Sequence, residues 1–383
     1  MAAILFLLAL ATLVAHVATA IQVLLGIRSI RALRDLPPLE GALPRVSILI
    51  PARNEERNLE EALRSVLALD YDNLEIEVID DRSTDRTGEI LDRMAAADPR
   101  LRVVHVRELP PGWLGKNHAL WMGAEKATGE FLLFTDADVV MEPSTLRRAV
   151  GAMVADGLDH LTASPTIDRP TVLFEMFIGT FALFFALFVK PWKVKDPKSS
   201  AHIGIGAFNL VRASAYRAAG GHRAIAMRPD DDLKLGKLLK KNGFRPEFIF
   251  AQGLMRVEWY SSVRELIQGL MKNAFSGVDY RVWVVALSTV FQLLFLVWPF
   301  LAVFLTSGPT RWLNLGSALV LVGLCWINAP LAGVRRWHGI GFPLATLLFL
   351  YILWRATILT LWNGGIVWRG TRYPLAELKA NKV

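Results

Sequence analysis

Two aspartates, Asp136 and Asp138, close an apolar run at residues 131–134 and are separated by one residue. In an extended chain, residues two apart face the same way, so both carboxylates can point into one cleft beyond the end of a strand. Such a pair suits a hard divalent cation, Mg2+ or Mn2+, that bridges the oxygens of a diphosphate. Two solvated acids in a turn would give the same pattern, so the interpretation depends on the other motifs in the chain.

A second acidic pair, Asp80 and Asp81, directly follows another strand-like run. Ser83 or Thr84 followed by acids is an ordinary helix cap, and we expect that role here as well. Capping does not account for two consecutive acids at the end of a strand, where the edge of a nucleobase or ribose could be hydrogen-bonded. Asp81 is the predicted nucleobase contact, with Asp80 as the alternative.

The segment at residues 112–117, Gly-Trp-Leu-Gly-Lys-Asn, opens the helix expected before the Asp136 strand. A helix N-terminus with nearby glycines can bind an anion, and Lys116 would act there as a point charge for a diphosphate. The segment is not a P-loop, because its length is wrong and it lacks the Ser or Thr. The alternative is that it forms only a turn.

The elements that must position these groups alternate between strand-like and helix-like patterns. This alternation predicts an α/β fold with a mostly parallel, doubly wound sheet, in which ligands bind at the carboxyl ends of the strands. The expected strands are 46–50, 75–79, 102–106 and 131–135, and the expected helices are 55–69, 84–97 and 117–127.

The composition indicates an integral membrane protein: of 383 residues, 53% are hydrophobic and 12 are Trp. Residues 1–27 carry no Asp, Glu, Lys or Arg and are followed by Arg28, which predicts an uncleaved anchor with its amino terminus outside. Residues 18–20 could instead be a signal-peptidase site, but no basic region precedes the apolar run. The net charge of +8 lies mostly in segments flanking apolar stretches, so we expect no nucleic-acid partner.

The expected organisation is an anchor at 1–27, a linker at 28–45, a cytosolic domain at 46–282, transmembrane or re-entrant helices at 283–368 and a basic tail at 369–383. Apolar stretches at 282–306 and 312–334 can each cross a bilayer. A third, 340–362, contains Arg355, and three crossings would leave the basic tail outside. We therefore expect a re-entrant hairpin bent near Arg355; the alternative is that the positive-inside rule fails here.

Taken together, the polar motifs resemble the GT-A nucleotide-sugar domain of family 2 glycosyltransferases. The resemblance rests on residues 46–56, 80–85, 115–117 and 136–138, and covers roughly residues 45–280. It implies an inverting enzyme with a uracil-type base near Asp81 and the diphosphate and metal near Asp136 and Asp138. The donor contacts that it implies are Pro51, Asn54, Glu55, Lys116, Asn117 and Asp136.

An inverting transfer also needs a carboxylate that takes the proton of the acceptor hydroxyl. Asp230, Asp231 and Asp232 open a basic helix that stops before Gly243. Measured back from Gly243, the family's acid-Asp pair matches Asp231 and Asp232, so Asp232 is the predicted base and Asp231 its neighbour in the site. Three acids at a helix start would also favour the helix dipole without any catalysis.

The acceptor side is less defined in the sequence. Residues 172–189 are nearly long enough to cross a membrane, but a crossing would separate Asp138 from Asp232, so we expect an interfacial or core helix. Gly206 lies in a segment that resembles the family's acceptor side, although its glycines could also mark a strand bulge. The remaining candidates are Trp259, Tyr260, Lys272, Trp368 and Arg369.

The Arg-Trp motif that polymer-forming members and ceramide glucosyltransferases usually carry after the base is missing, which disfavours polymer synthesis. The sequence most resembles bacterial hopanoid-associated and carotenoid-type glycosyltransferases. The predicted function is transfer of one sugar from a nucleotide-sugar, such as a UDP-sugar, to a lipid hydroxyl at the cytosolic face of a bacterial-type inner membrane. Alternatives are a polyisoprenyl-phosphate sugar synthase, a small polysaccharide synthase, and a catalytically dead nucleotide-sensing scaffold. The sequence does not indicate an oligomeric state.

Overall fold

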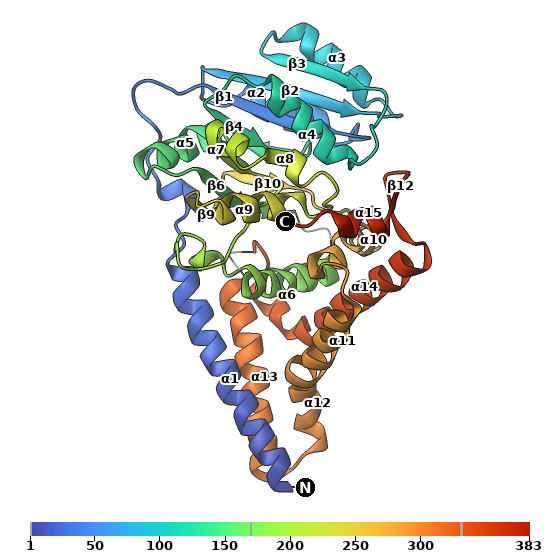
Figure 1. The fold of residues 1–383 in the computed structure, drawn as a ribbon. Coiled ribbons are helices and arrows are strands. Elements are labelled where there is room, and N and C mark those ends of the chain that lie inside the picture. Colours follow the sequence, from blue (N-terminus) through green and yellow to red (C-terminus); the bar gives the residue numbers. More distant parts are fainter. Residues whose placement is uncertain (1, 169–170, 330–331) are drawn as a thin grey trace. The chain divides into compact units, whose positions relative to one another are not determined.

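The computed structural model describes residues 2–168, 171–329 and 332–383, and the chain divides into two compact units. The sheet unit contains Ile30–Asp168, Pro191–Glu258 and Tyr373–Val383. The helical unit contains Met1–Ser29, Arg169–Lys190 and Trp259–Arg372. Each unit is therefore assembled from segments far apart in the sequence, as the mixed colours in Figure 1 show.

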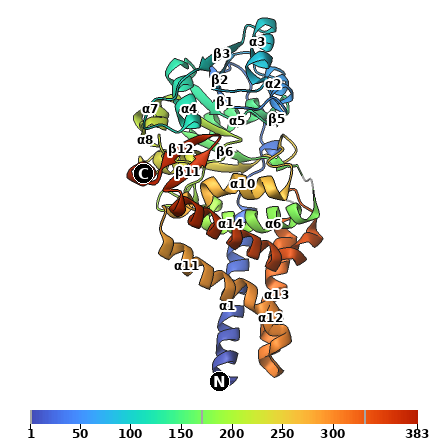
Figure 2. The same ribbon diagram turned by 90° about the vertical axis from the view of Figure 1, so that its right-hand side faces the viewer.

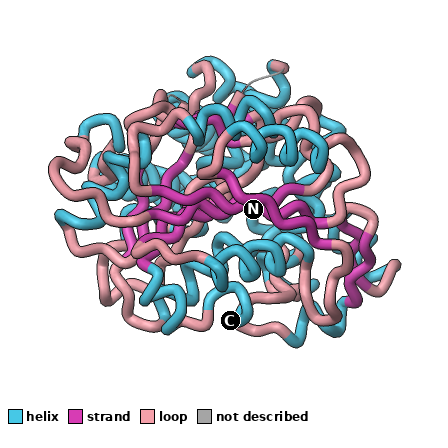
Figure 3. The backbone as a smooth tube through the Cα atoms, turned by 90° about the horizontal axis from the view of Figure 1, so that it is seen from above, coloured by secondary structure: helices cyan, strands magenta, loops and turns pink. Residues whose placement is uncertain are grey.

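The sheet unit is built on a mixed seven-stranded sheet with the order β3-β2-β1-β4-β8-β6-β9. The four strands β3, β2, β1 and β4 are neighbours in that order, and each pair of neighbours runs parallel. Strand β8 runs antiparallel to both β4 and β6. Helices lie on both faces of this sheet (Figure 3). The predicted α/β class is thus confirmed, with β8 as the antiparallel exception.

The strands of the main sheet are β1 (Val46–Ala52), β2 (Leu74–Asp81), β3 (Leu101–Val106), β4 (Phe131–Phe134), β6 (His160–Ser164), β8 (Asn209–Arg212) and β9 (Pro246–Phe250). A smaller sheet contains β5 (Val139–Met141), β10 (Met255–Val257) and β7 (Thr166–Ile167). The helices are α2 (Leu59–Leu67), α3 (Thr87–Ala97), α4 (Gly115–Lys126), α5 (Thr145–Ala155), α7 (Ala213–Ala218), α8 (Gly221–Ala224), α9 (Asp231–Lys241) and α15 (Leu375–Ala380), with short 3-10 turns at Leu33–Asp35 and Pro191–Lys193.

Two apolar cores hold this sheet, one on each face. Ile48 of β1 and Leu133 of β4 are register partners and belong to one buried cluster. Their chain neighbours Leu49 and Leu132 belong to the other cluster. Because successive strand residues face opposite sides, the continuous apolar runs of β1 and β4 fill both layers at once. The strand ends are thereby fixed, and the polar residues that follow them are held at one edge of the sheet.

The starts of two helices differ from the prediction. The helix expected from residue 55 begins at Leu59, and the one expected from residue 84 begins at Thr87. The reason is that the two preceding loops bind each other: the Asn54 N–H donates to Ser83 Oγ at 3.0 Å, and the Thr84 N–H donates to Asn54 Oδ1 at 2.8 Å. The expectation that Ser83 or Thr84 caps α3 is therefore wrong.

Within the helical unit, α1 (Ala2–Arg28) packs along α13 (Gly308–Asn328), and α12 (Trp298–Leu305) also packs on α13. The other elements are α6 (Val172–Val189), α10 (Val263–Ala274), a 3-10 turn at Ser276–Val278, α11 (Val282–Phe291), a π-helical segment at Gln292–Val297, a 3-10 segment at Arg336–Gly341, α14 (Phe342–Trp362) and strand β11 (Gly365–Trp368), which pairs with β12 (Thr371–Pro374). In the described part of the chain, five helical segments are long and apolar enough to cross a membrane: Ala2–Arg28, Val172–Lys193, Val282–Leu305, Gly308–Asn328 and Arg336–Trp362.

These five segments do not share one direction. In Figures 1 and 2, α6 and α14 run across the common direction of α1 and α13. The re-entrant bend expected near Arg355 is wrong, because α14 is one continuous helix from Phe342 to Trp362. The Arg355 side chain is exposed, and Trp354 Nε1 anchors α14 by donating to Thr289 Oγ1 of α11 at 2.8 Å.

A buried histidine predicts how the stability of the sheet unit depends on pH. His160 of β6 is fully buried; its Nε2 bonds Asn209 Oδ1 at 3.0 Å, and its Nδ1 has no hydrogen-bond partner among the described residues. Burial lowers the pKa of His160 from 6.5 to about 4. Between pH 6.5 and 4 the unfolded chain therefore binds a proton at this histidine that the folded chain excludes. The free energy of unfolding is highest above pH 6.5 and falls as the pH decreases through this range.

From this shift we expect the free energy of unfolding to fall by about 2 kcal/mol between pH 8 and pH 5 through His160 alone. A His160→Gln variant, which keeps a donor toward Asn209, should lack that part of the pH dependence. Thermal unfolding of both proteins at several pH values is the measurement. Identical pH slopes for the two proteins would contradict the assignment.

Candidate active site

Carboxylates from two distant parts of the sheet unit meet at one lysine. Lys116, in the first turn of α4, places its Nζ 2.8 Å from Asp136 Oδ1, just beyond β4, and 3.5 Å from Asp231 Oδ2, at the start of α9. These three side chains and Asp232 line one cavity. Its other lining residues are Pro51, Leu120, Phe134, Thr135, Gly206, Asn209, His222 and Leu235.

Gly206 ties the two acidic groups together through its backbone. Its N–H donates to Asp232 Oδ2 at 2.9 Å, and its carbonyl oxygen accepts from the Asp136 N–H at 3.1 Å. A Cβ at position 206 would lie 2.6 Å from Asp136 Oδ2 and 3.3 Å from Lys116 Nζ, so the Asp136 carboxylate would have to shift to admit it. The position lies among the acids, in the turn before β8 rather than in a strand.

Burial and like charge shape the electrostatics of the site. Burial, followed by the charge of Asp231, raises the pKa of Asp232 to about 7. Burial opposes the charge of Lys116, but Asp136, Asp231 and Asp232 outweigh it and raise the pKa of the lysine. Lys116 therefore remains a cation at all physiological pH values, while Asp232 can exchange a proton near neutrality.

The second acid of the central pair, Asp138, lies beside further negative charge. Its pKa is raised to about 7, first by burial and then by the charges of Asp136 and Glu55. A hard cation would relieve this repulsion, and Mg2+ is commonly held by one or two carboxylates together with substrate phosphates. No group of three or more His, Cys, Asp or Glu side chains suited to a metal occurs among the described residues. The donor set of Asp136 and Asp138 fits that requirement.

The Asp80 and Asp81 side chains lie beside this cavity rather than in it. Asp81 is buried and its carboxylate accepts from Arg82 Nε at 2.7 Å, from a terminal Arg82 nitrogen at 2.9 Å and from Arg53 at 3.3 Å. Asp80 accepts from the Ser83 N–H at 3.2 Å and bonds His105 Nδ1 at 2.8 Å. Asp80 is therefore engaged in holding the strand end. The proposed nucleobase contact at Asp81 stays a prediction, and the arginines are its partners in this structure.

The other predicted donor contacts occupy different places. Pro51 lines the cavity, and its contact with the donor stays a prediction. Asn54 adopts a left-handed φ of 55° and binds the neighbouring loop. Asn117 does not line the cavity: it is fully buried, and its Nδ2 donates to the carbonyl oxygens of Ile225 and Arg228 at 2.8 and 2.9 Å. The Asn117 amide fixes the loop that leads to Asp231. No local sequence signal indicates this role.

Four acceptor-side candidates line a second cavity, within the helical unit. Tyr260, Lys272, Trp368 and Arg369 surround it together with residues of α10, α14 and β11. Lys272 Nζ lies 4.3 Å from the centre of the Trp368 ring. Trp259 does not line this cavity; its ring packs between those of Tyr260 and Phe181, both at 5.2 Å. The predicted set thus divides between the units, with Gly206 in the sheet unit.

The chain is similar in sequence and in fold to known glycosyltransferases. Residues 47–218 match the family described as Glycosyl transferase family 2. The 4,4'-diaponeurosporenoate glycosyltransferase of Staphylococcus haemolyticus is 26% identical over 241 residues, covering 61% of this chain and 62% of that protein. The probable glycosyltransferase YdaM of Bacillus subtilis is 34% identical over 116 residues, covering 30% of this chain and 27% of that protein. The chain thus spans less than two thirds of the length of these relatives.

A solved mannosyltransferase from Pyrobaculum calidifontis, in complex with GDP-Man and Mn2+, aligns with 94% of this chain and 99% of its own at a TM-score of 0.56 and 21% identity. That likeness establishes a common fold. The mixed sheet with carboxylates beyond its strand ends is a GT-A fold, joined to apolar helices long enough to cross a membrane. The match to Glycosyl transferase family 2 falls on residues 47–218, the part of the chain that holds most of the motifs noted in the sequence.

The close approach at Gly206 gives a direct test of the site geometry. A Gly206→Ala methyl would collide with Asp136 Oδ2, so the Asp136–Lys116 pair must move. We expect the free energy of unfolding to fall by about 1–3 kcal/mol, as for overpacked interiors. Thermal unfolding measures this, with Gly277→Ala as the control, because a methyl there meets nothing within 4 Å. Equal stability of the two variants would show that the cavity is looser than described.

Proposed function

We propose that this protein is a metal-dependent inverting glycosyltransferase that moves a single sugar from a nucleotide-sugar, a UDP-sugar by the resemblance at Asp81, to a lipid hydroxyl at the cytosolic membrane face. The observation that carries the proposal is the meeting of Asp136, Lys116 and Asp232 at one cavity. Diphosphate recognition and proton abstraction must occur within a few ångströms of each other, and the proximity of these candidate groups supports the proposal.

Asp232 is the proposed general base. Its two carboxylate oxygens are fixed by the N–H groups of Gly206 and Leu233, at 2.9 and 2.7 Å. In the transfer, Asp232 takes the proton of the acceptor hydroxyl while that oxygen forms its bond to the anomeric carbon. The bond from that carbon to the diphosphate oxygen breaks, and its electron pair leaves with the diphosphate. A pKa of about 7 suits a group that must gain and release a proton at neutral pH.

Asp136 and Asp138 are the residues that would hold a Mg2+ or Mn2+ ion, which when bound supplies Lewis-acid stabilisation of the leaving diphosphate. Lys116 adds a positive charge 2.8 Å from Asp136 Oδ1, where it can stabilise developing negative charge on the leaving diphosphate. The Mn2+ bound by the Pyrobaculum mannosyltransferase supports this choice of cofactor.

The path of the chain supports a membrane arrangement. Strand β4 pairs with β8, so the residues before and after α6 lie in one sheet, and α6 cannot cross a bilayer between them. Suppose that α1, the α11–α12 segment and α13 cross the bilayer while α6 and α14 lie along its surface. Every segment that connects the helical unit to the sheet unit then lies on the same side of the membrane. Both Ile30 and Tyr373 do belong to the sheet unit. The arginines after α1 and the basic residues of the tail support a cytosolic location of that face, by the positive-inside rule.

The cavity of the helical unit supports a lipid acceptor. Part of its wall comes from α14, a candidate membrane helix, and part from the polar residues Gln268, Lys272 and Arg369. Such a site can receive an amphipathic molecule with its polar end near the charges. The diaponeurosporenoate glycosyltransferases among the relatives support an acceptor of carotenoid type.

The base assignment predicts a specific loss in one variant. Asp232→Asn cannot accept the proton, so the turnover number should fall by about 10²–10⁴-fold. Binding of the donor nucleotide should persist, because the acids nearest Lys116 remain. Transfer of radiolabelled sugar to extracted lipid, together with calorimetry of nucleotide binding, makes the measurement. The exposed Asp72→Asn is the matched control, and turnover unchanged in Asp232→Asn would refute the assignment.

A change in the acceptor cavity should affect the KM for the lipid acceptor, whereas the loss of the base affects the turnover number. Lys272→Ala removes the cation beside the Trp368 ring, so the KM for the lipid acceptor should rise about three- to tenfold while the donor KM stays constant. Exposed Lys198→Ala serves as the control for the loss of one charge. An increase in the donor KM alone would place Lys272 on the other substrate.

A further inference from the structure

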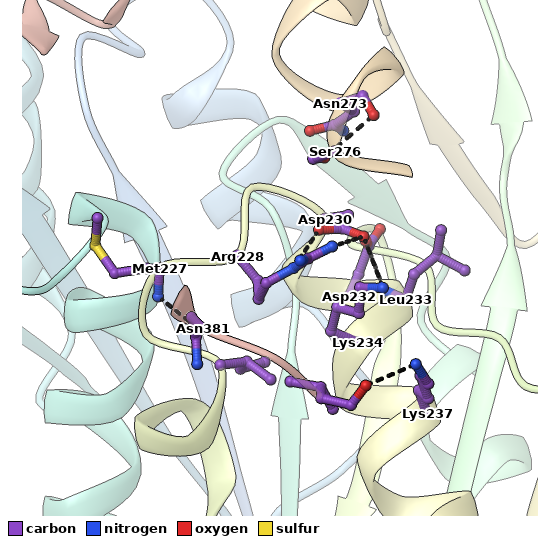
Figure 4. Close-up of polar contacts among 12 residues, drawn as sticks. Met227, Arg228, Asp230, Asp232, Leu233, Lys234, Lys237, Asn273, Ser276 and Asn381 are labelled. Carbon is purple, nitrogen blue, oxygen red and sulfur yellow. Dashed lines mark hydrogen bonds and ion pairs between the residues drawn. The ribbon is translucent and has the colours of Figure 1, made fainter. Parts of the chain in front are cut away.

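The C-terminal segment Tyr373–Val383 is part of the sheet unit, although the chain reaches it from the helical unit. Leu378 of α15 is fully buried. The segment is also held by polar contacts: Lys237 Nζ of α9 donates to the Val383 carbonyl oxygen at 2.7 Å, and Asn381 bonds the loop before α9 (Figure 4). A segment joined to the unit by its core and by polar contacts along its length is a fixed part of that unit.

Tyr373 lies at one end of the segment, beside the donor half of the site. Its hydroxyl accepts the backbone N–H of Gly115, the first residue of α4, at 3.3 Å. The same hydroxyl interacts with the guanidinium of Arg82, which holds both oxygens of Asp81. Gly115 in turn packs so tightly on this pair that a Cβ there would lie 2.1 Å from Asp81 Oδ2. Because Lys116 is the next residue, Tyr373 fixes the helix start from which that ammonium extends.

Asn381 lies near the other end, beside the acidic half. Its Oδ1 accepts the Met227 N–H and its Nδ2 donates to the Ala224 carbonyl oxygen, both at 2.9 Å. Asn117 holds the same loop from α4. The loop continues into Asp230, which pairs with Arg228 at 3.0 Å, and then into the two acids of the cavity. Figure 4 shows this succession from Asn381 through Met227 and Arg228 to Asp232.

We propose that the segment is a clasp with two positioning residues: Tyr373 sets the donor-binding half of the site and Asn381 sets the acidic half. The inference rests on the proposed function and adds that residues far from the sequence motifs tune the two halves separately. It follows from the contacts, because Tyr373 bonds the residue that precedes Lys116, while Asn381 bonds the loop that delivers Asp231 and Asp232.

Steady-state kinetics of the full-length protein in detergent test this with two conservative changes. Tyr373→Phe removes only the hydroxyl and should raise the donor KM about three- to tenfold with kcat nearly unchanged. Asn381→Ala should lower kcat by a similar factor with the donor KM nearly unchanged. Exposed Glu377→Gln, in the same segment, should change neither constant. Calorimetry with UDP should show the Tyr373→Phe defect without any acceptor present.

Three outcomes would overturn the inference while leaving sugar transfer intact: loss of thermal stability with both constants unchanged, the same change of constants in both variants, or a lower donor KM in Tyr373→Phe. The last would identify Tyr373 as a plug that competes with the donor. If the wild-type protein binds no nucleotide and transfers no sugar, the proposed function itself fails, and the clasp fails with it.

Discussion

The site depends on one electrostatic constraint: several carboxylates lie close together, and their mutual repulsion must be offset by positive charge. Lys116 meets this constraint by placing one ammonium between Asp136 and Asp231, and it is itself tolerable in the interior only because those acids surround it. Its position in turn depends on the start of α4, and the positions of the acids depend on the end of β4 and the start of α9. The rest of the sheet unit brings these three element ends together.

Close backbone contact makes that assembly possible. A Cβ at Gly204 would lie 1.9 Å from the Asp232 carbonyl oxygen, and one at Gly236 would lie 2.1 Å from the Ile203 carbonyl oxygen. The absence of side chains at these two positions lets the segment before β8 lie directly against α9. The Gly206 N–H then reaches the Asp232 carboxylate, so the proposed base is aimed by the main chain rather than by a mobile side chain. Preorganised backbone donors of this kind need no rearrangement during reaction.

The sequence allowed the α/β class to be predicted, because the alternation of apolar strand and helix patterns is a regular feature. The apolar run before Asp136 does form the strand β4, whereas the choice of Asp232 as base came from the resemblance to family 2 glycosyltransferases and stays a prediction. Partners that are distant in the chain could not be predicted in the same way. Arg53 and Arg82 engage Asp81, and Asn117 is turned toward a loop more than 100 residues away. A polar residue at a strand end can face a ligand or the protein, and composition does not distinguish the two.

The same limit applies to the membrane segments. The hydropathy of α14 predicts only that it prefers an apolar environment, and the expected bend near Arg355 followed from charge alone. In the structure α14 is a continuous helix that lies across the direction of α1 (Figures 1 and 2). The role of Tyr373–Val383 also became visible only once its contacts with α4 and the loop before α9 were seen, because nothing in its composition links it to the acidic motifs.

The most direct test of the account is the stereochemistry of the product. Membranes containing the protein would be incubated with nucleotide-sugars of known anomeric configuration, and the extracted lipid product would be examined by NMR and mass spectrometry. A single displacement with Asp232 as base predicts inverted anomeric configuration at the sugar. The missing Arg-Trp motif predicts one sugar per lipid. Retained configuration, a polymeric product or the absence of any glycolipid across the panel would contradict it.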